Sequence, residues 1–283
     1  MGNTLSLPAL DVPRLLRKYG LHPDKRLGQV FLVDPVALQQ VVDVANITSS
    51  DVVLEIGPGL GSLTRYLAAR GGSIIAVELD ENLIEPLKHV INSFNNVQVV
   101  RGDILELDLS QIILAQEYLI VANIPYYITS AVIRHLLSSH IRPKCIVLTV
   151  QQEVAIRICA TPGNLSLLAL SVQVFGRPQL IAHIPAGAFY PPPEVDSAVL
   201  RIELFPEPLI PSAQLDAFFR LAKAGFSQKR KTIRNSLAGG LALKPDEVEQ
   251  LLLAANIEPR RRAESLSLEE WGKLTSIFVT RFV

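Results

Sequence analysis

Five short apolar runs alternate with longer segments of helical periodicity in the first half of the chain. The runs are rich in valine and isoleucine and are too short for helices; they occupy residues 52–56, 74–77, 97–100, 119–122 and 145–150. The helix-like segments between them span residues 60–69, 81–92 and 130–138. Continuous apolar strands of this kind are buried on both faces. We therefore expect a doubly wound α/β sheet whose first strands are parallel.

A proline-rich segment at residues 205–211 interrupts this alternation. A helix-like segment at 165–174 and two apolar runs, 180–185 and 198–204, precede it, and the two runs suit an antiparallel edge. Prolines 206, 208 and 211 continue neither a helix nor a central strand. Beyond them the periodicity is helical only, near 212–224, 229–237, 245–255 and 267–279. We expect a Rossmann-like domain at 1–205 and a small all-α domain at 206–283.

The composition is that of a folded chain, with 49% hydrophobic and 19% charged residues. We find neither a bilayer-spanning apolar stretch nor a cleavable signal, which favours a soluble cytoplasmic protein without a membrane partner. Residues 1–6 fit the loose N-myristoylation pattern, which is often met by chance. Cys145 and Cys159 are expected to be reduced thiols, and the five scattered histidines predict no metal site. Nothing indicates an obligate dimer, so we expect a monomer.

The formal net charge of zero hides an uneven distribution. Segment 14–26 is mostly basic, and segment 217–245 holds seven basic residues and no acid. The basic residues of the second segment are Arg220, Lys223, Lys229, Arg230, Lys231, Arg234 and Lys244. A concentration of positive charge is the electrostatic mark of nucleic-acid binding, although a solvated helix face has the same composition.

A glycine-rich turn, EIGPGLG at residues 55–61, directly follows the first strand and opens the first helix. Glycines at 57, 59 and 61 let the backbone turn sharply and lie against a ligand. A tight turn without a ligand is the structural alternative. The dinucleotide pattern requires glycine at position 62, where this chain has Ser62, so a nicotinamide cofactor is disfavoured.

Polar residues also end the next three strands. Glu78 follows the second strand, where a carboxylate can bind both ribose hydroxyls of an adenosyl group. Asp103 ends the third strand and is placed to receive an adenine amino group, or is simply an exposed turn acid. Asn123 ends the fourth. Because the carboxyl ends of parallel strands share one rim, we expect these residues to form one ligand site.

The tetrapeptide NIPY at 123–126 supplies groups that hold a planar amino group. The Asn123 amide and a backbone carbonyl can accept its two N–H bonds, Pro125 brings no competing donor, and the Tyr126 ring can stack on a purine. Phe189, in the FYPPPEVDS run, is the candidate for the other face of the base. A turn after a strand and a proline-rich connection are the structural alternatives.

Taken together these motifs resemble the ribosomal RNA adenine-N6,N6-dimethyltransferase family over nearly the whole chain. GQVFL at 28–32 is similar to its N-terminal motif, and EIGPGLGSLT, VELD, GDIL, NIPYY and FYPPPEVDS follow in the family's order. FSQKRKTIRNSL at 226–237 resembles its helical domain. The resemblance implies S-adenosyl-L-methionine as cofactor. The positions that it implies for cofactor binding are Gln29, Val30, Leu32, Gly57, Gly59, Glu78, Asp103 and Asn123.

The same resemblance implies transfer of four methyl groups to two adjacent adenosines in the 3′-terminal hairpin of small-subunit ribosomal RNA, within an assembling 30S-type subunit. Asn123, Pro125, Tyr126 and Phe189 would hold the adenine. The RNA-binding residues would be Lys229, Arg230, Lys231 and Arg234. Two departures bear on this expectation: Val30 stands where the family usually has Asn or His, and the loop at 161–167 is short. Val30 predicts weaker cofactor binding.

Three alternatives remain. A resistance-type methylase of large-subunit RNA is the rival within the family, disfavoured by the QKRKTIRNSL segment and the neutral overall charge. A non-catalytic ribosome-assembly or transcription factor would share the fold, but intact Asn123, Tyr126, Glu78 and Asp103 favour an enzyme. Methyltransferases of DNA adenine or of protein glutamine use a related tetrapeptide, and the basic helical tail favours RNA over both.

Overall fold

A computed structural model describes residues 7–282, so the lipidation pattern at residues 1–6 lies outside the described residues. The chain forms two compact units. The first contains the residues up to 155 together with 179–204, and the second contains 156–178 together with the residues from 205 onward. Residues 156–178 thus group with the second unit, and the domain boundary near 205 stays a prediction.

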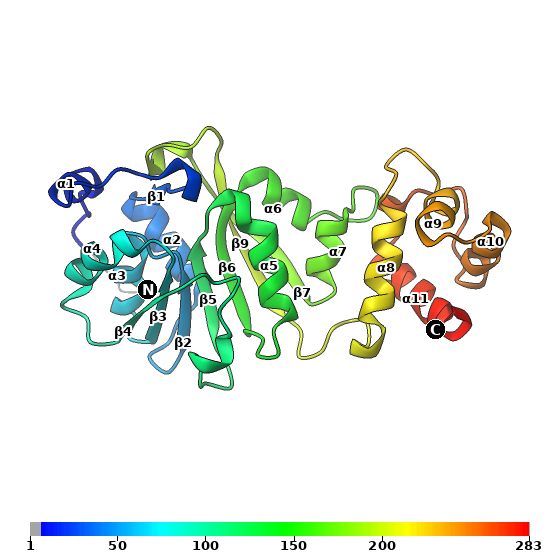
Figure 1. Cartoon of the computed structure of the whole chain (residues 1–283), viewed down its shortest axis with the longest axis horizontal. Helices are drawn as coiled ribbons and strands as arrows, with labels where there is room; N and C mark the ends of the chain where they lie inside the picture. Colours follow the sequence, from blue (N-terminus) through cyan, green and yellow to red (C-terminus); the bar gives the residue numbers. More distant parts are fainter. Residues whose placement is uncertain (1–6, 283) are drawn as a thin grey trace. The chain divides into compact units, whose positions relative to one another are not determined.

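The first unit is built on a seven-stranded sheet of order β4-β3-β2-β5-β6-β9-β7 (Figure 1). Its strands are β2 (Val52–Ile56), β3 (Ser73–Glu78), β4 (Val97–Arg101), β5 (Leu119–Asn123), β6 (Cys145–Gln151), β7 (Gly176–Ile184) and β9 (Ser197–Leu204). The strands from β4 to β6 run parallel, and β9 is antiparallel to β6. The predicted doubly wound sheet with an antiparallel edge is therefore confirmed.

Burial of both sheet faces explains why the strands are continuously apolar. Val53, Leu119 and Cys145 pack in one core cluster with α2 (Pro35–Ala45) and α3 (Ser62–Ala69). Their sequence neighbours Leu54, Ile120 and Ile146 point to the opposite face and are also fully buried. The further helices that follow strands of this unit are α4 (Glu81–Ile91), α5 (Thr129–Ser138) and α6 (Gln152–Ile158), of which α6 crosses into the second unit.

An N-terminal arm, residues 11–32, packs onto this sheet unit. It consists of α1 (Val12–Lys18), the 3-10 turn η1 (Lys25–Leu27) and the short strand β1 (Phe31–Leu32). β1 pairs antiparallel with β8 (Phe189–Tyr190) in a separate two-stranded sheet, which ties the arm to the segment before β9. The apolar face of α1 is buried in a cluster with Phe31, Leu60 and Leu83. The arm is thus anchored beside the glycine turn that follows β2.

The second unit is mainly helical. Its helices are α7 (Leu167–Gln173), α8 (Leu215–Gly225), α9 (Ile233–Leu241), α10 (Pro245–Ala254) and α11 (Leu268–Phe282). Phe218, Trp271 and Phe278 are buried in its core. α9 begins at Ile233, not near residue 229 as predicted, because the Thr232 hydroxyl caps it by accepting the N–H of Asn235. Residues 229–231 consequently lie in a turn.

Within residues 7–282, no helix is long and apolar enough to cross a membrane. The same residues contain no group of three or more His, Cys, Asp or Glu side chains arranged to hold a metal ion. Cys145 and Cys159 form no disulfide bond, and Cys145 is buried.

Candidate cofactor and substrate pocket

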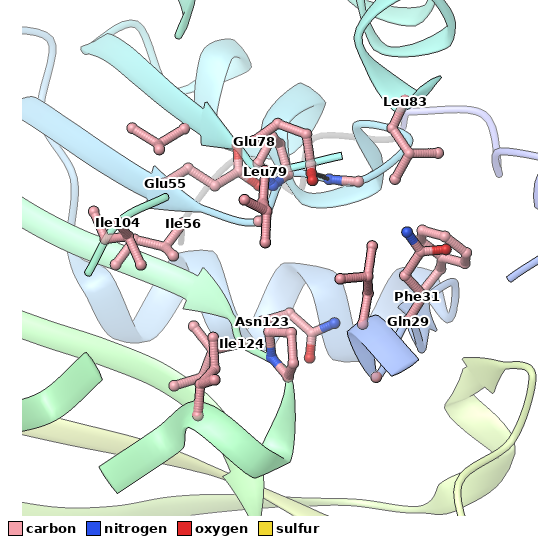
Figure 2. A pocket seen from close by; sticks show the side chains of 18 of the residues that line it. Gln29, Phe31, Glu55, Ile56, Glu78, Leu79, Leu83, Ile104, Asn123 and Ile124 are labelled. Carbon is pink, nitrogen blue, oxygen red and sulfur yellow. Dashed lines mark hydrogen bonds between the residues drawn. The ribbon is translucent and has the colours of Figure 1, made fainter. Parts of the chain in front are cut away.

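One pocket opens at the carboxyl ends of the parallel strands, between them and the N-terminal arm (Figure 2). It collects residues that follow β2, β3, β4 and β5, as the strand-end pattern predicts. The predicted cofactor residues that line it are Gln29, Val30, Leu32, Gly57, Gly59, Glu78, Asp103 and Asn123. The structure therefore brings together in one cavity all eight positions of the predicted cofactor set, although the role of each stays a prediction.

The glycine turn forms one wall of the pocket. Gly57, Gly59 and Gly61 all have positive φ angles. At Gly59 a Cβ atom would lie 2.9 Å from a ring carbon of Phe31. Only a residue without a side chain can therefore adopt this backbone while the arm packs against it.

Glu78 is held rigidly at the end of β3. Its Oε2 accepts the backbone N–H of Gly59 at 2.9 Å, and its Oε1 accepts that of Asp80 at the same distance. Burial raises the pKa of Glu78, and these two donors oppose the rise. The carboxylate thus connects the glycine turn to the start of α4, and each oxygen keeps lone pairs for a further donor such as a ribose hydroxyl.

Asn123 presents an unused acceptor to the pocket. Its Nδ2 donates to the backbone carbonyl of Val30 at 2.9 Å, whereas its Oδ1 has no hydrogen-bond partner among the described residues. In Figure 2 Asn123 lies across the pocket from Glu78. Because the amide nitrogen is already bound, the orientation of the side chain is fixed and Oδ1 is free for a ligand N–H.

Gln29 connects the arm to the start of α4, and both polar atoms of its side chain are bound within the protein. Its Nε2 donates to Asp80 Oδ2 at 2.8 Å, and its Oε1 accepts the backbone N–H of Asp24 at 2.8 Å. Leu32 is buried in the core, and Val30 packs partly against the same cluster. The arm therefore contributes mainly backbone atoms and apolar surface to the pocket. We call the two hydrogen bonds of Gln29, to Asp80 and to the backbone of Asp24, the Gln29 latch.

Asp103 lies in the loop after β4. Its Oδ1 accepts the backbone N–H of Leu105 at 2.9 Å. Asp103 and its neighbour Ile104 both line the pocket, and a contact of Asp103 with an adenine amino group stays a prediction.

The residues predicted to hold the target base are only partly gathered here. Pro125 lines the pocket, but Tyr126 and Phe189 are not among its lining residues. The Tyr126 hydroxyl is 2.7 Å from Ser197 Oγ, and Phe189 is 3% exposed and pairs with Leu32. Tyr127, which the sequence reading missed, does line the pocket and is 62% exposed. Whether Tyr126 and Phe189 contact a base stays a prediction.

Glu55 is a second residue that the sequence reading missed. It is 1% exposed, lines the pocket at the end of β2, and its Oε2 has no hydrogen-bond partner among the described residues. Burial, and secondarily the nearby Glu78, raise the pKa of Glu55 to about 8. Its place as the first residue of EIGPGLG, at a strand end, was the signal that could have found it.

The predicted RNA-binding residues belong to the second unit. Lys229, Arg230 and Lys231 are exposed in the turn before α9. Arg234 differs, because its guanidinium forms ion pairs with Asp246 at 3.1 Å and Glu249 at 2.7 Å. Three of the four cations are therefore available to phosphate groups, and the fourth is partly neutralised within the chain.

Comparison with known proteins agrees with this geometry. The family model described as ribosomal RNA adenine dimethylase matches residues 21–279. The chain belongs to the ribosomal RNA adenine dimethylase family. Membership makes it a methyltransferase, and the sheet order and the glycine turn agree with the Rossmann-like fold class.

Relatives within the ribosomal RNA adenine dimethylase family match almost end to end. The ribosomal RNA small subunit methyltransferase A of Dehalococcoides mccartyi (strain CBDB1) is 44% identical, covering 95% of this chain and 94% of the relative. The protein of the same name from Pelotomaculum thermopropionicum is 39% identical, covering 95% of each chain. The residues of the Gln29 latch and those that line the pocket therefore lie within the matched length.

Solved structures show the same fold. A dimethyladenosine transferase from Plasmodium falciparum superposes with a TM-score of 0.75 at 26% identity, covering 88% of this chain and 98% of the other. The 23S rRNA methyltransferase ErmE superposes with a TM-score of 0.71 at 26% identity, covering 87% and 98%. The predicted fold class is thus confirmed.

Proposed function

We propose that this protein transfers methyl groups from S-adenosyl-L-methionine to N6 of two adjacent adenosines in the 3′-terminal hairpin of small-subunit ribosomal RNA. The observation that carries the proposal is the unpartnered Oδ1 of Asn123, fixed in place in the pocket that the strand-end acids also line. An acceptor in that position suits an exocyclic amino group, which must be held while its nitrogen becomes tetrahedral. The names of the similar bacterial proteins support the small subunit as substrate.

The pocket residues fit the cofactor. Glu78 would accept the ribose hydroxyls, Asp103 the adenine amino group, and the backbone at Gly57 and Gly59 would lie against the ligand. The buried carboxylates at 55 and 78 suit a ligand with a positive charge. When bound, the cofactor supplies a methyl group on a sulfonium centre. The residues of this chain orient that group and exclude water from it.

The target adenine would be held on the other side of the pocket. Asn123 Oδ1 accepts one N–H of the amino group, and Pro125 leaves no competing backbone donor beside it. Tyr126 and Phe189 would stack on the base, which requires their rings to turn toward it from their present contacts. Stacking of this kind contributes about 1–3 kcal/mol per base and offsets the cost of extruding it.

The helical unit would dock the RNA. Lys229, Arg230 and Lys231 supply the phosphate contacts, and Arg234 contributes through its ion pairs to the stability of α9. We propose that the protein acts as a monomer in the cytoplasm, on assembling 30S-type subunits.

A large-subunit methylase is the second candidate, favoured by the superposition on ErmE. The relatives named for the small subunit have higher identity, 44% against 26%, and cover more of this chain. A non-catalytic assembly factor has no use for the free acceptor of Asn123, so the enzyme is preferred.

The deciding experiment incubates the purified protein with undermethylated small subunits and methyl-labelled cofactor, then maps the label. We expect dimethyladenosine in the 3′-terminal hairpin, and no transfer by Asn123→Ala. Large subunits lacking their own adenine methylation serve as the competing substrate. Label confined to large subunits would establish the second candidate, and binding of small subunits without any transfer would establish the assembly factor.

A further inference from the structure

Glu55 is a buried acid without a compensating cation. The groups that act on it are Glu78 from β3 and the neutral Thr64 hydroxyl from α3, and neither is positively charged. Arg65, the buried cation of α3, donates instead to the carbonyl of Pro8 at 2.9 Å. Asp103, in the loop after β4, and Asn123, at the end of β5, also line the pocket and bring no positive charge either. Within residues 7–282, Glu55 takes part in no ion pair that would stabilise its charged form.

A carboxylate in that environment has two ways to avoid an isolated buried charge. It can bind a proton, or it can face a cation supplied by a ligand. The cavity wall at Glu55 and its unpartnered Oε2 leave both ways open. Figure 2 shows Glu55 beside Glu78, so ionising both in an empty pocket would place two like charges close together.

We propose that Glu55 carries a proton while the pocket is empty and releases it when a positively charged ligand enters, so that binding of the methyl donor is coupled to proton release. The inference rests on the proposed function, because it requires a cationic ligand in this pocket. Charge balances in each state: the proton leaves to solvent as the sulfonium charge arrives. No bond to the ligand is formed or broken.

The coupling has a consequence for the reaction product. S-adenosylhomocysteine has the same amino and carboxyl groups as the donor but lacks the sulfonium charge. Its binding therefore stabilises the ionised form of Glu55 less than binding of the donor does. A proton on Glu55 therefore competes with the donor more than with the product. Preference for donor over product should rise with pH up to about 8, the value to which burial raises the pKa of Glu55, and then level off.

The test is isothermal titration calorimetry of the full-length protein in two buffers of different ionisation enthalpy. We expect the donor to release more protons than S-adenosylhomocysteine at about pH 7, with the difference falling toward zero above about pH 9. The donor Kd should fall by up to tenfold for each pH unit between about 6 and 8, and the product Kd by less. The sulfonium charge lowers the pKa of the donor's own amino group, so the proton exchange of each ligand's amino group is titrated separately and subtracted.

Glu55→Gln, which resembles the protonated side chain, should abolish the difference in proton release and make the donor Kd independent of pH over this range. Glu153→Gln, at an exposed acid of the same unit, is the matched control and should behave as the wild type. Equal proton counts for donor and product in the wild type would overturn the inference, even if the variant failed to fold. If both ligands bind in that case, the proposed function survives; if neither binds, both fall.

Discussion

The side-chain amide of Asn123 donates to the backbone carbonyl of Val30, so one residue of the arm determines which atom of the asparagine faces the pocket. The two residues are 93 positions apart in the sequence. An aspartate at 123 would place an oxygen against that carbonyl, with no proton between them. The contact therefore selects an amide at this position, and it does so through the backbone of residue 30.

Replacing Asn123 by aspartate should consequently cost more than the loss of one acceptor. We expect Asn123→Asp to lower kcat by about 10²-fold or more and to destabilise the fold by about 1–3 kcal/mol, because the part-buried carbonyl of Val30 loses its donor. Single-turnover methyl transfer and urea denaturation measure the two effects. Asn164→Asp, at an exposed position, is the control. Full activity in Asn123→Asp would show that the contact with Val30 does not orient the side chain.

The latch formed by Gln29 predicts a different kinetic signature. Gln29→Leu removes both of its hydrogen bonds, to Asp80 and to the backbone of Asp24, which should loosen the arm. We expect the cofactor KM to rise about tenfold with a smaller change in kcat. Limited trypsin digestion should cut faster after Lys25 or Arg26. Gln40→Leu, on exposed α2 surface, should leave both readouts unchanged; an unaltered digestion pattern in Gln29→Leu would contradict the latch.

A substitution at Val30 can test the effect of its side chain on cofactor binding while keeping its backbone carbonyl, which binds Asn123. Val30→Asn keeps the carbonyl that binds Asn123 and adds a polar side chain at the pocket wall. We expect the cofactor Kd to fall several-fold, consistent with one hydrogen bond of about 1 kcal/mol. Equilibrium dialysis with labelled cofactor measures the change. An unchanged Kd would remove the valine as a cause of weaker binding.

The basic turn before α9 should govern the salt dependence of RNA binding. We expect Lys229→Glu with Arg230→Glu to weaken binding and to reduce the slope of log K against log salt by about 0.7–0.9 for each lost phosphate contact. Arg234→Gln should act mainly on stability, because its partners Asp246 and Glu249 lie within the chain. Lys273→Glu, at an ion-paired surface lysine of α11, is the control for charge alone. An unaltered slope in the double variant would exclude these contacts.

Glu55 also predicts how stability depends on pH. Its pKa rises from the ordinary 4.5 to about 8 on folding, so the folded protein holds a proton that the unfolded chain has lost between those values. Stability without ligand should therefore fall as pH rises through this window, by at most about 1.4 kcal/mol per pH unit, and change little above it. Glu55→Gln should flatten the profile in denaturant titrations at pH 5 to 9. A wild-type profile already flat there would contradict the raised pKa.

The sheet was predictable because its signal is local. Each parallel strand is a short apolar run rich in valine and isoleucine, and polar residues at or just after the ends of four of them line the pocket. The start of α2 was also readable, since Asp34 caps the helix and Pro35 stands at its first position, yet the sequence reading passed over it. The start of α9 was misplaced because the cap at Thr232 outweighs the helical pattern of residues 229–231.

The details of the site were harder to predict from the sequence, because they depend on contacts between residues that are distant in the chain. Nothing near Asn123 indicates that Val30 would bind its nitrogen. Likewise, the 3-10 turn η3 (Tyr126–Ile128) directs successive side chains differently, so that Tyr127 lines the pocket while the Tyr126 hydroxyl contacts Ser197. The place of Glu55 in EIGPGLG marks it as a candidate, but the lack of a cation near it depends on residues distant in sequence and cannot be predicted from its neighbours in the chain.

The pairing of β1 with β8 also has a bearing on how the protein is made. The arm leaves the ribosome well before its strand partner, Phe189–Tyr190, which lies more than 150 residues further along the chain. Until that segment emerges, Val30 has no fixed place from which to orient Asn123, and the pocket lacks one wall. A nascent chain that ended before residue 189 would contain the glycine turn and the strand-end acids, but the arm that positions Asn123 would lack its strand partner. The ability to transfer methyl groups therefore arises late in translation.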